Sequence, residues 1–190
     1  MSESRSGVRR SDATRDRIRR AARTRFAADG YRGATIRAIA ADAGIDASLV
    51  IRYFGDKQRL FVSVVDVDLR LPELRDVARR RLGAVLVEHF LTRWESEDDA
   101  LLTLLRSAVT DPVALASMQR LFREQLAPAV AALVDDDREA ATRAGLIATQ
   151  MLGLALVRHV LRLPPVAAAS RADLVRQVGP TVQAYLTRPV

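Results

Sequence analysis

The sequence predicts an all-α fold with two domains, a short helix-turn-helix domain followed by a larger helical domain. Apolar residues recur at the three- and four-residue spacing of a helix along most of the 190-residue chain, and glycine and proline residues separate these segments. The charge is also divided between two regions. Residues 1–60 contain 14 Lys and Arg residues against 7 acidic residues, whereas residues 61–190 contain 16 of each. A polyanion is therefore the expected partner of the first region.

Composition excludes several classes of protein and of chemistry. Hydrophobic residues make up 49% of the chain, which is typical of a globular protein. Cysteine is absent, so the chain can form no disulfide, thiol nucleophile or cysteine-ligated metal site. The N-terminal residues lack the apolar segment of a signal peptide, and the most apolar stretch, Gly145–Val157, is shorter than the ~20 residues of a membrane span. We therefore expect a soluble cytoplasmic protein.

The segment Thr35–Phe54 is typical of two short helices around a tight turn. Thr35 can cap the first helix, whose apolar residues have the spacing of one buried face. Gly44 then ends this helix, because glycine adopts the left-handed conformation at little cost. Asp46 or Ser48 can cap the second helix. This pattern predicts a helix-turn-helix, whose second helix binds in the DNA major groove, although an ordinary helical hairpin would share it.

A longer helix is predicted before this segment, over residues 12–29. Asp12 can act as its N-cap, Gly30 ends it, and arginines on its outer face can approach phosphates. Residues 1–11 are polar, contain three arginines and show no periodicity, so we expect a disordered basic arm. Such an arm can enter the DNA minor groove or serve only solubility.

Residues 12–61 resemble the DNA-binding domain of the TetR family of bacterial regulators. The matching residues follow one another in order over about fifty positions. They are Ile18, Ala21, Ala22, Phe26, Gly30, Tyr31, Ala34, Thr35, Ile36, Ile39, Ala40, Ala43, Gly44, Ile45, Tyr53, Phe54, Gly55, Asp56, Lys57, Leu60 and Phe61. The resemblance implies a DNA-binding domain over 12–56 and a helical ligand-binding and dimerisation domain over 57–190.

The geometry of a helix-turn-helix suggests a role for each candidate DNA contact. We expect Thr35 and Arg37 to hold phosphate or to reach an adjacent base. Arg52 is the best candidate for base recognition, because arginine can bind guanine through two hydrogen bonds. Tyr53 and Lys57 should contact phosphate. The other candidates on or near the exposed face of the second helix are Asp46, Ala47, Ser48 and Leu49, of which the alanine and the leucine can make only apolar contacts.

Ile51 departs from the family pattern. The TetR family commonly has a tyrosine at this position, which bonds a phosphate. Isoleucine cannot make that bond, so we expect one phosphate contact fewer. We also expect Ile51 to join Val50 and Phe54 in the buried face of the second helix.

Six further helices are predicted in the second domain. Their expected limits are 57–71, 73–94, 99–110, 113–134, 137–163 and 171–186. Pro72 separates the first two, Pro128 should kink or split the fourth, and Pro164 ends the fifth. The three adjacent carboxylates at 135–137 can suggest a metal site, but the start of a helix explains them better.

The two C-terminal helices predict a homodimer. Helix 137–163 is apolar on nearly all sides, so it must be buried on nearly all sides. Together with 171–186 it has more apolar surface than one subunit can cover, which favours a four-helix interface between two copies. The other interpretation is that both helices close the core of a monomer. The resemblance favours the dimer, and a small DNA reader also needs two half-sites for specificity.

No enzyme motif occurs, and the two histidines, His89 and His159, lack metal-binding spacing, so we expect no catalytic residue, cofactor or metal. The second domain is expected to form a small-molecule pocket instead. The candidate ligand-binding residues are His89, Phe90, Trp94, Met118, Phe122, Gln150 and Met151, each of which can equally be a core residue. This lining favours a largely apolar organic effector, while nearby basic residues also permit an anionic one.

Together these inferences predict a sequence-specific transcription regulator, most simply a repressor that a small effector releases from a palindromic double-stranded DNA operator. Effector would bind better when the two DNA-binding domains are misplaced for successive major grooves, so by linkage it would weaken operator binding. One alternative is a helical ligand-binding protein or enzyme without DNA function, which the departure at Ile51 slightly favours. Another is an architectural protein that binds DNA without sequence preference.

Overall fold

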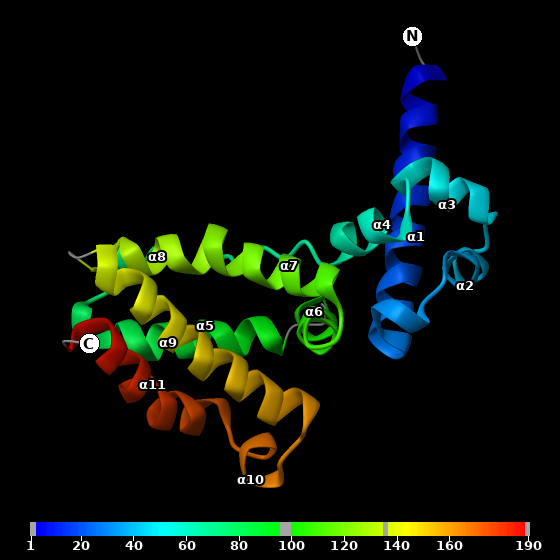
Figure 1. Cartoon of the computed structure of the whole chain (residues 1–190). Helices are drawn as coiled ribbons and strands as arrows, with labels where there is room; N and C mark the ends of the chain where they lie inside the picture. Colours follow the sequence, from blue (N-terminus) through cyan, green and yellow to red (C-terminus); the bar gives the residue numbers. More distant parts are fainter. Residues whose placement is uncertain (1–2, 96–99, 135–136, 189–190) are drawn as a thin grey trace. The chain divides into compact units, whose positions relative to one another are not determined.

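The structure is a computed structural model that describes residues 3–95, 100–134 and 137–188. Every regular element in these ranges is helical, which confirms the predicted all-α class (Figure 1). The helices form two compact units. Unit 1 comprises Met1–Val67 and Asp99–Ser117, and unit 2 comprises Asp68–Asp98 and Met118–Val190.

Unit 1 is built around one long helix. Its helices are α1 (Glu3–Gly33), α2 (Ile36–Asp42), α3 (Ala47–Phe54), α4 (Lys57–Val64), α6 (Ala100–Ala108) and the first part of α7 (Pro112–Leu121). Helices α2, α4 and α6 all contact α1. Each contributes apolar side chains at helical spacing, as the sequence predicts for α1 and α2.

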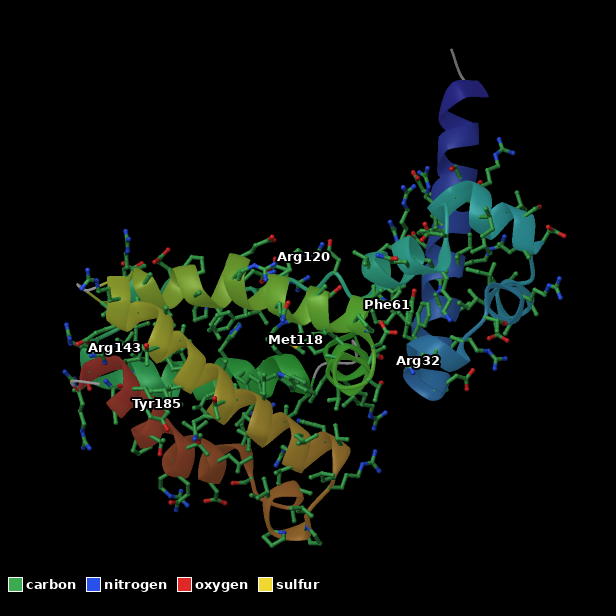
Figure 2. All side chains as sticks on the ribbon, in the orientation of Figure 1. Arg32, Phe61, Met118, Arg120, Arg143 and Tyr185 are labelled. Carbon is green, nitrogen blue, oxygen red and sulfur yellow. The ribbon has the colours of Figure 1, made fainter. Side chains whose placement is uncertain are left out.

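Aromatic rings form the centre of unit 1. Phe26 of α1 and Phe61 of α4 are buried and meet edge to face, with ring centroids 5.0 Å apart. Figure 2 labels Phe61 on α4. Tyr31 meets Phe61 in the same way at 4.9 Å. Edge-to-face pairs of this kind stabilise a core beyond the area that they bury. Phe61 anchors α4 in this core, and the first segment of unit 1 continues to Val67.

Helix α1 differs from the prediction at its start. It begins at Glu3, so the backbone of residues 3–11 is helical where the sequence predicts a disordered arm. Residues that extend an existing helix need no new nucleus and gain a hydrogen bond each, so a polar segment can join it. Residues 1–2 of the expected arm lie outside the described residues. Gly30 interrupts the helix with φ 68° and ψ 176°, in agreement with its predicted role.

A bidentate ion pair fixes α2 against α1. The Nε and NH2 groups of Arg25 donate to the two carboxylate oxygens of Asp42 at 2.5 and 2.9 Å. Charge-assisted pairs with this fork geometry are stronger and more directional than single contacts. The hydrogen bond from Arg25 lowers the pKa of Asp42, and the charge of the guanidinium adds to this effect. The α2 helix therefore has both an apolar and a polar attachment to α1.

Helix α4 ends at Val64, earlier than the predicted limit at residue 71. The chain then runs without regular structure to residue 73. Side chains of unit 2 satisfy this backbone in place of helical hydrogen bonds. The ring nitrogen Nε2 of His89 lies 2.8 Å from the Leu69 carbonyl oxygen, and the Leu69 N–H donates to Gln125 at 2.7 Å. Backbone groups with such partners do not need the helix that the apolar pattern suggested.

Unit 2 packs its helices around a second apolar core. Its elements are α5 (Leu82–Trp94), the end of α7, α8 (Ala127–Ala131), α9 (Asp137–Ala155), α10 (Pro164–Ala167) and α11 (Arg171–Thr187). Figure 1 shows α9, in yellow and orange, packed with α8 and α11, and α11 packs most extensively on α5. Buried core residues come from several of these helices, including Leu91, Val130, Ile147 and Val182.

Three of the predicted helices in unit 2 are interrupted. Two 3₁₀ turns, Leu74–Asp76 and Arg79–Arg81, precede α5, which begins only at Leu82. A π-helical turn, Phe122–Leu126, lies before Pro128 and confirms the break predicted there, because proline lacks the N–H that an α-helix requires. A second π-helical turn, Leu156–Val160, ends the long apolar helix before Pro164. The short helix α10 that follows was not predicted.

Helices α5 and α11 approach each other closely at two glycines. A Cβ atom built on Gly83 would lie 2.3 Å from the Gly179 carbonyl oxygen and 2.5 Å from the Gln183 backbone nitrogen. The Gln183 side chain also bridges the helices, because it accepts from the Gly83 N–H at 2.9 Å and donates to the Arg79 carbonyl at 2.8 Å. Only glycine fits at position 83 without moving the backbone of α11.

The segment Arg138–Val160 is long and apolar enough to span a membrane, with a mean hydropathy of 1.4. The central helix of a packed domain meets the same criteria. Here the buried Arg143 donates to the Glu139 carboxylate and to the Tyr185 carbonyl oxygen, each at 2.5 Å (Figure 2). Because this guanidinium joins the segment to α11 within unit 2, we interpret it as a core helix.

Two predicted features lie wholly or partly outside the described residues. The predicted start of the helix 99–110 is one, and α6 is described from Ala100. The other is the acidic cluster at 135–137, of which the side chains are not described. Within the described ranges, no group of histidine, aspartate and glutamate side chains has the arrangement of a metal site.

The first prediction concerns the α5–α11 contact. Gly83→Ala should destabilise the protein by about 1–3 kcal/mol or more, because the new methyl group meets backbone atoms that cannot rotate away. Urea unfolding followed by circular dichroism measures this change. Thr92→Ala, at an exposed position of the same helix, is the control and should change stability by less than about 1 kcal/mol. Equal stability of the two variants would contradict the close contact.

The second prediction concerns the Arg25–Asp42 pair. The folded protein lowers the pKa of Asp42, so its contribution to stability is complete above the pKa of the unfolded state, about 4. It is lost as the pH falls through the lower folded pKa, because the unfolded state then binds the proton first. The unfolding free energy of Asp42→Asn should therefore fall less steeply than that of the parent below about pH 4. Glu124→Gln, an exposed carboxylate in unit 2, is the matched control.

Candidate DNA-binding surface

The turn between α2 and α3 has the local geometry of a helix-turn-helix. The Thr35 hydroxyl accepts from the Ala38 N–H at 3.1 Å and caps α2, as predicted. Gly44 has φ 64°, the left-handed conformation that was expected to end α2. Beyond it, the Ile45 N–H returns to the Ala40 carbonyl oxygen at 3.0 Å. These hydrogen bonds close the turn and set the direction in which the chain enters α3.

Asp46 is the N-cap of α3. Its carboxylate accepts from the Ser48 N–H at 2.7 Å. Hydrogen bonds from the Ser48 side chain and backbone lower the pKa of Asp46, so the carboxylate stays charged at the helix start, where the helix dipole favours a negative charge. The helix has eight residues, and Val50 is its fully buried anchor. The opposite side of α3 therefore remains available to a partner.

The predicted DNA contacts divide into two groups by exposure. Thr35, Arg37, Asp46, Ser48 and Arg52 are exposed, whereas Ala47, Leu49, Tyr53 and Lys57 are partly buried. All nine come from α2, α3 and α4 or from the caps of these helices. Unit 1 thus holds every candidate on three consecutive short helices, and none is in the buried core.

The expected core position of Ile51 is wrong. Its side chain is 44% exposed, whereas the neighbouring Val50 is fully buried. Successive residues on a helix are about 100° apart, so a buried Val50 directs Ile51 toward a different side. Ile51 lies in an exposed stripe with Ser48 and Arg52, which occupy the spacing of one helix face. The apolar pattern alone could not show which of the two adjacent residues faced the core.

Arginines of α1 cover the aromatic residues at the end of α3. The guanidinium of Arg15 lies 5.4 Å from the centre of the Tyr53 ring, and that of Arg19 lies 5.7 Å from the centre of the Phe54 ring. A cation over an aromatic face is attracted by the negative face of the ring. These contacts hold the C-terminal end of α3 against α1 and place positive charge beside it. Arg15 was not among the sequence candidates, because its partner is far along the chain.

Lys57 is the first residue of α4, and contacts with α1 hold its side chain in place. Its ammonium group lies 4.7 Å from the centre of the Tyr31 ring and donates to the Arg32 carbonyl oxygen at 3.3 Å. An ammonium group has three donors, so further donors remain after this bond. The neighbouring Asp56 caps α4 by accepting from the Arg59 N–H at 2.7 Å. The position of the Lys57 charge is therefore determined by contacts within unit 1.

The candidate effector residues lie in unit 2, on α5, α7 and α9 and in the π-helical turn after α7. His89, Phe90 and Trp94 are on α5, and the His89 ring is used to hold the Leu69 carbonyl. Met151 is buried in the core, and Gln150 lies 3.5 Å from the Tyr185 hydroxyl group. Met118 at the end of α7 and Phe122 in the following π-helical turn are partly buried.

Two hollows of the unit 2 surface have other linings. One, of about 470 Å³, lies between the segment 68–75, which ends in the first 3₁₀ turn, and α8, with Gln125, Pro128 and Leu133 in its wall. The other, of about 740 Å³, is lined by Glu88, Glu95 and Val175 and by three arginines. Neither lining includes a predicted effector residue.

A histidine outside the candidate set joins their aromatic cluster. The His159 ring stacks on Trp94 with centroids 5.7 Å apart, and Trp94 lies 5.4 Å from Phe90. The Nε2 atom of His159 is buried and has no hydrogen-bond partner in the described structure. Burial lowers the pKa of His159, and the charge of Arg158 lowers it further, so the ring is neutral at pH 7.

Glu95 connects the end of α5 to the α9 and α11 region. Its carboxylate accepts from Arg158 at 3.1 Å and from Arg171 at 2.5 Å. Burial raises the pKa of Glu95, but the two guanidiniums outweigh this effect and the net shift is downward. Arg158 also donates to the carbonyl oxygens of Val166 and Ala169. This network fixes the α10 segment beside the aromatic cluster.

Comparisons with known families and structures agree with this architecture. Residues 18–64 match the family of bacterial regulatory proteins named tetR, and residues 81–186 match the tetracyclin repressor-like C-terminal domain. A comparison with curated proteins found no match. The second family match alone covers more than half of the chain, and it includes most of unit 2.

Solved structures with the same fold are also known. A TetR-family regulator from Streptomyces coelicolor A3 is 30% identical, with a TM-score of 0.63 over 92% of this chain and 94% of that chain. A proposed TetR-family transcriptional regulator from Mesorhizobium loti MAFF303099 is 21% identical, with a TM-score of 0.61 over 93% and 96% of the two chains. A hemolysin II transcriptional regulator is 17% identical, with a TM-score of 0.56 over 91% and 98%. The last two show a common fold only.

Homodimerisation and response to a ligand are typical of proteins with this pair of domains. Such proteins bind DNA through the N-terminal helix-turn-helix and are not enzymes. The capped α2 and α3 helices, the left-handed Gly44 turn and the matches over both units lead to one assignment. The chain belongs to the TetR family of DNA-binding transcriptional regulators.

Proposed function

We propose that the protein is a sequence-specific repressor that binds a palindromic operator as a homodimer and is released by a small, largely apolar effector. The observation that carries this proposal is the exposed stripe of α3, in which Ser48, Ile51 and Arg52 face away from the buried Val50. An eight-residue helix with one anchored face and one free face fits the requirements of a recognition helix in the major groove.

The individual contacts follow from side-chain chemistry. Arg52 would bind guanine through two hydrogen bonds, and Ser48 and Asp46 would contact other base edges. Ala47 and Leu49 would make apolar contacts. Thr35, Arg37, Tyr53 and Lys57 would hold the phosphates and set the register of α3 on the duplex. The excess of positive charge in residues 1–60 supports this orientation, because phosphate contacts supply much of the affinity for DNA.

Dimerisation through α9 and α11 would place two copies of α3 on the two halves of the operator. Support comes from apolar surface that the single chain leaves exposed just beyond α9, where Leu156 and Leu161, at the two ends of the π-helical turn, are 38% and 55% exposed. Gly145 and Gly153 of α9 also face open space, with no atom within 4 Å of an added Cβ. Small residues of this kind allow a helix of a second copy to approach closely. The palindrome would then mirror the two-fold axis of the dimer.

The effector would bind unit 2 and act by linkage. A ligand that binds better when the two DNA-binding units are misplaced for successive major grooves must weaken operator binding to the same extent. The proposed contacts remain His89, Phe90, Trp94, Met118, Phe122, Gln150 and Met151, a set in which apolar side chains predominate. Helix α4 and the segment after it would transmit the change. A soluble regulator of this kind would act in the cytoplasm.

Selection of bound duplexes from a random DNA pool at ~150 mM salt tests the proposal. The expected result is a two-fold symmetric sequence bound at least ~10³-fold more tightly than scrambled DNA. Equal binding to all sequences with a steep salt dependence would favour an architectural role. An absence of DNA binding even at low salt would favour the alternative of a ligand-binding protein or enzyme.

Arg52 provides the third prediction. Arg52→Ala should reduce discrimination at one base position of the selected site by about 1–3 kcal/mol, because it removes a bidentate contact. Binding constants for the parent site and for each single-base variant measure this effect. Arg106→Ala removes an exposed arginine of α6 and is the control. An unchanged base preference in Arg52→Ala would remove this residue from base recognition.

Lys57 provides the fourth prediction. Lys57→Met keeps an apolar stem over the Tyr31 ring but removes the charge, so it should weaken binding to all sequences about equally. The slope of log K against log salt should become smaller in magnitude by about 0.9, the value for one phosphate contact. Lys57→Arg keeps the charge and should retain the slope. The phosphate assignment fails if Lys57→Met and the parent protein have equal slopes.

A further inference from the structure

Ile51 is the residue of the exposed α3 stripe to which the proposed contacts assign no partner. Its 44% exposed side chain lies between Ser48 and Arg52 on the face that the proposed function directs toward DNA. Exposed aliphatic residues are common on protein surfaces and need no special explanation when they occur singly. Ile51 differs because of its position, since every side chain on the free face of a recognition helix lies close to the bases or to the DNA backbone.

Helix geometry places the Ile51 side chain toward the start of α3. Side chains on a helix lean toward its N-terminus and cover the turn before their own Cα atom. The aliphatic group of Ile51 therefore lies over the turn that contains Ala47 and Ser48. In a helix-turn-helix the N-terminal residues of the second helix contact the base edges. Ile51 is thus directed toward bases and away from the C-terminal end, where Arg15 and Arg19 lie against Tyr53 and Phe54.

The chemistry of the side chain then limits what it can recognise. Isoleucine has no hydrogen-bond donor, so it cannot bind a phosphate or the polar edge of a base. The apolar group that the major groove presents is the C5-methyl group of thymine. A β-branched residue in a helix also has one strongly preferred rotamer, so it loses little conformational freedom when it makes a contact. A rigid aliphatic surface beside the small Ala47 side chain is therefore complementary to a methyl group.

We propose that Ile51 is a specificity-determining residue that recognises a thymine methyl group in each half of the operator. The inference rests on the proposed function, and it adds Ile51 to the proposed apolar contacts of Ala47 and Leu49 and to the polar recognition by Arg52. It also explains how the chain can lack a phosphate-bonding hydroxyl group at this position, since the side chain contributes sequence preference in place of general affinity.

A double-mutant cycle between protein and DNA tests this assignment. Each thymine of the selected site is replaced in turn by deoxyuridine, which lacks only the methyl group. For the parent protein one such replacement per half-site should weaken binding about fourfold, because the free energy of burying one methyl group is lost. For Ile51→Ala the same replacement should have no effect within about 1.5-fold, because the contact is already lost. Circular dichroism of each variant establishes that the helices are retained.

Two further variants sharpen the test. Ile51→Val retains the branched surface and should keep most of the sensitivity to the methyl group. Val109→Ala removes an exposed aliphatic side chain, 79% exposed, between α6 and α7 and should bind all the duplexes as the parent protein does.

The outcomes separate this inference from the proposed function. Loss of methyl sensitivity in Ile51→Ala at one thymine per half-site supports the assignment. A selected site whose deoxyuridine variants bind alike, or whose sensitivity persists in Ile51→Ala, overturns it and leaves the regulator function intact. Selection of no sequence by the parent protein overturns both.

Discussion

The geometry of the DNA-binding unit depends on how one short helix is held. Helix α3 has eight residues, which is too short to be stable in water without tertiary contacts. Asp46 caps its first turn, Val50 anchors its buried side, and arginines of α1 stack on the rings at its end. The left-handed Gly44 sets its direction relative to α2. Local hydrogen bonds and packing on α1 therefore together determine which face of α3 is exposed.

Helix α2 is also held by tertiary contacts, and one of these contacts is an ion pair. The Arg25–Asp42 pair spans α1 and α2, while Ile39 and Ala40 bury the other side of α2. The bidentate ion pair is directional and fixes the orientation of α2, whereas burial of its apolar face supplies stabilising free energy. Together they hold this seven-residue helix in one orientation. A recognition surface needs this rigidity, because base contacts tolerate only small errors of position.

The glycines of unit 2 lie in two kinds of place, at a close contact between helices and beside open space. The glycines at the α5–α11 crossing remove side-chain volume so that the helix backbones touch, whereas Gly145 and Gly153 of α9 face open space. The same residue type thus allows a close helix contact in the core and leaves open space at the surface of α9. Around Trp94, the Glu95 network with Arg158 and Arg171 and the buried Nε2 atom of His159, which has no hydrogen-bond partner among the described residues, form a polar edge beside the aromatic rings.

The sequence by itself determined the helical class, the helix-turn-helix and its caps, because Thr35, Gly44 and Asp46 act on backbone groups within a few residues. It also located the break near Pro128, which proline imposes locally. Tertiary structure alone decided that α4 ends at Val64, since residues distant in sequence satisfy the backbone that follows. It likewise decided which of Val50 and Ile51 is buried, because adjacent apolar residues differ only in the direction that packing gives them.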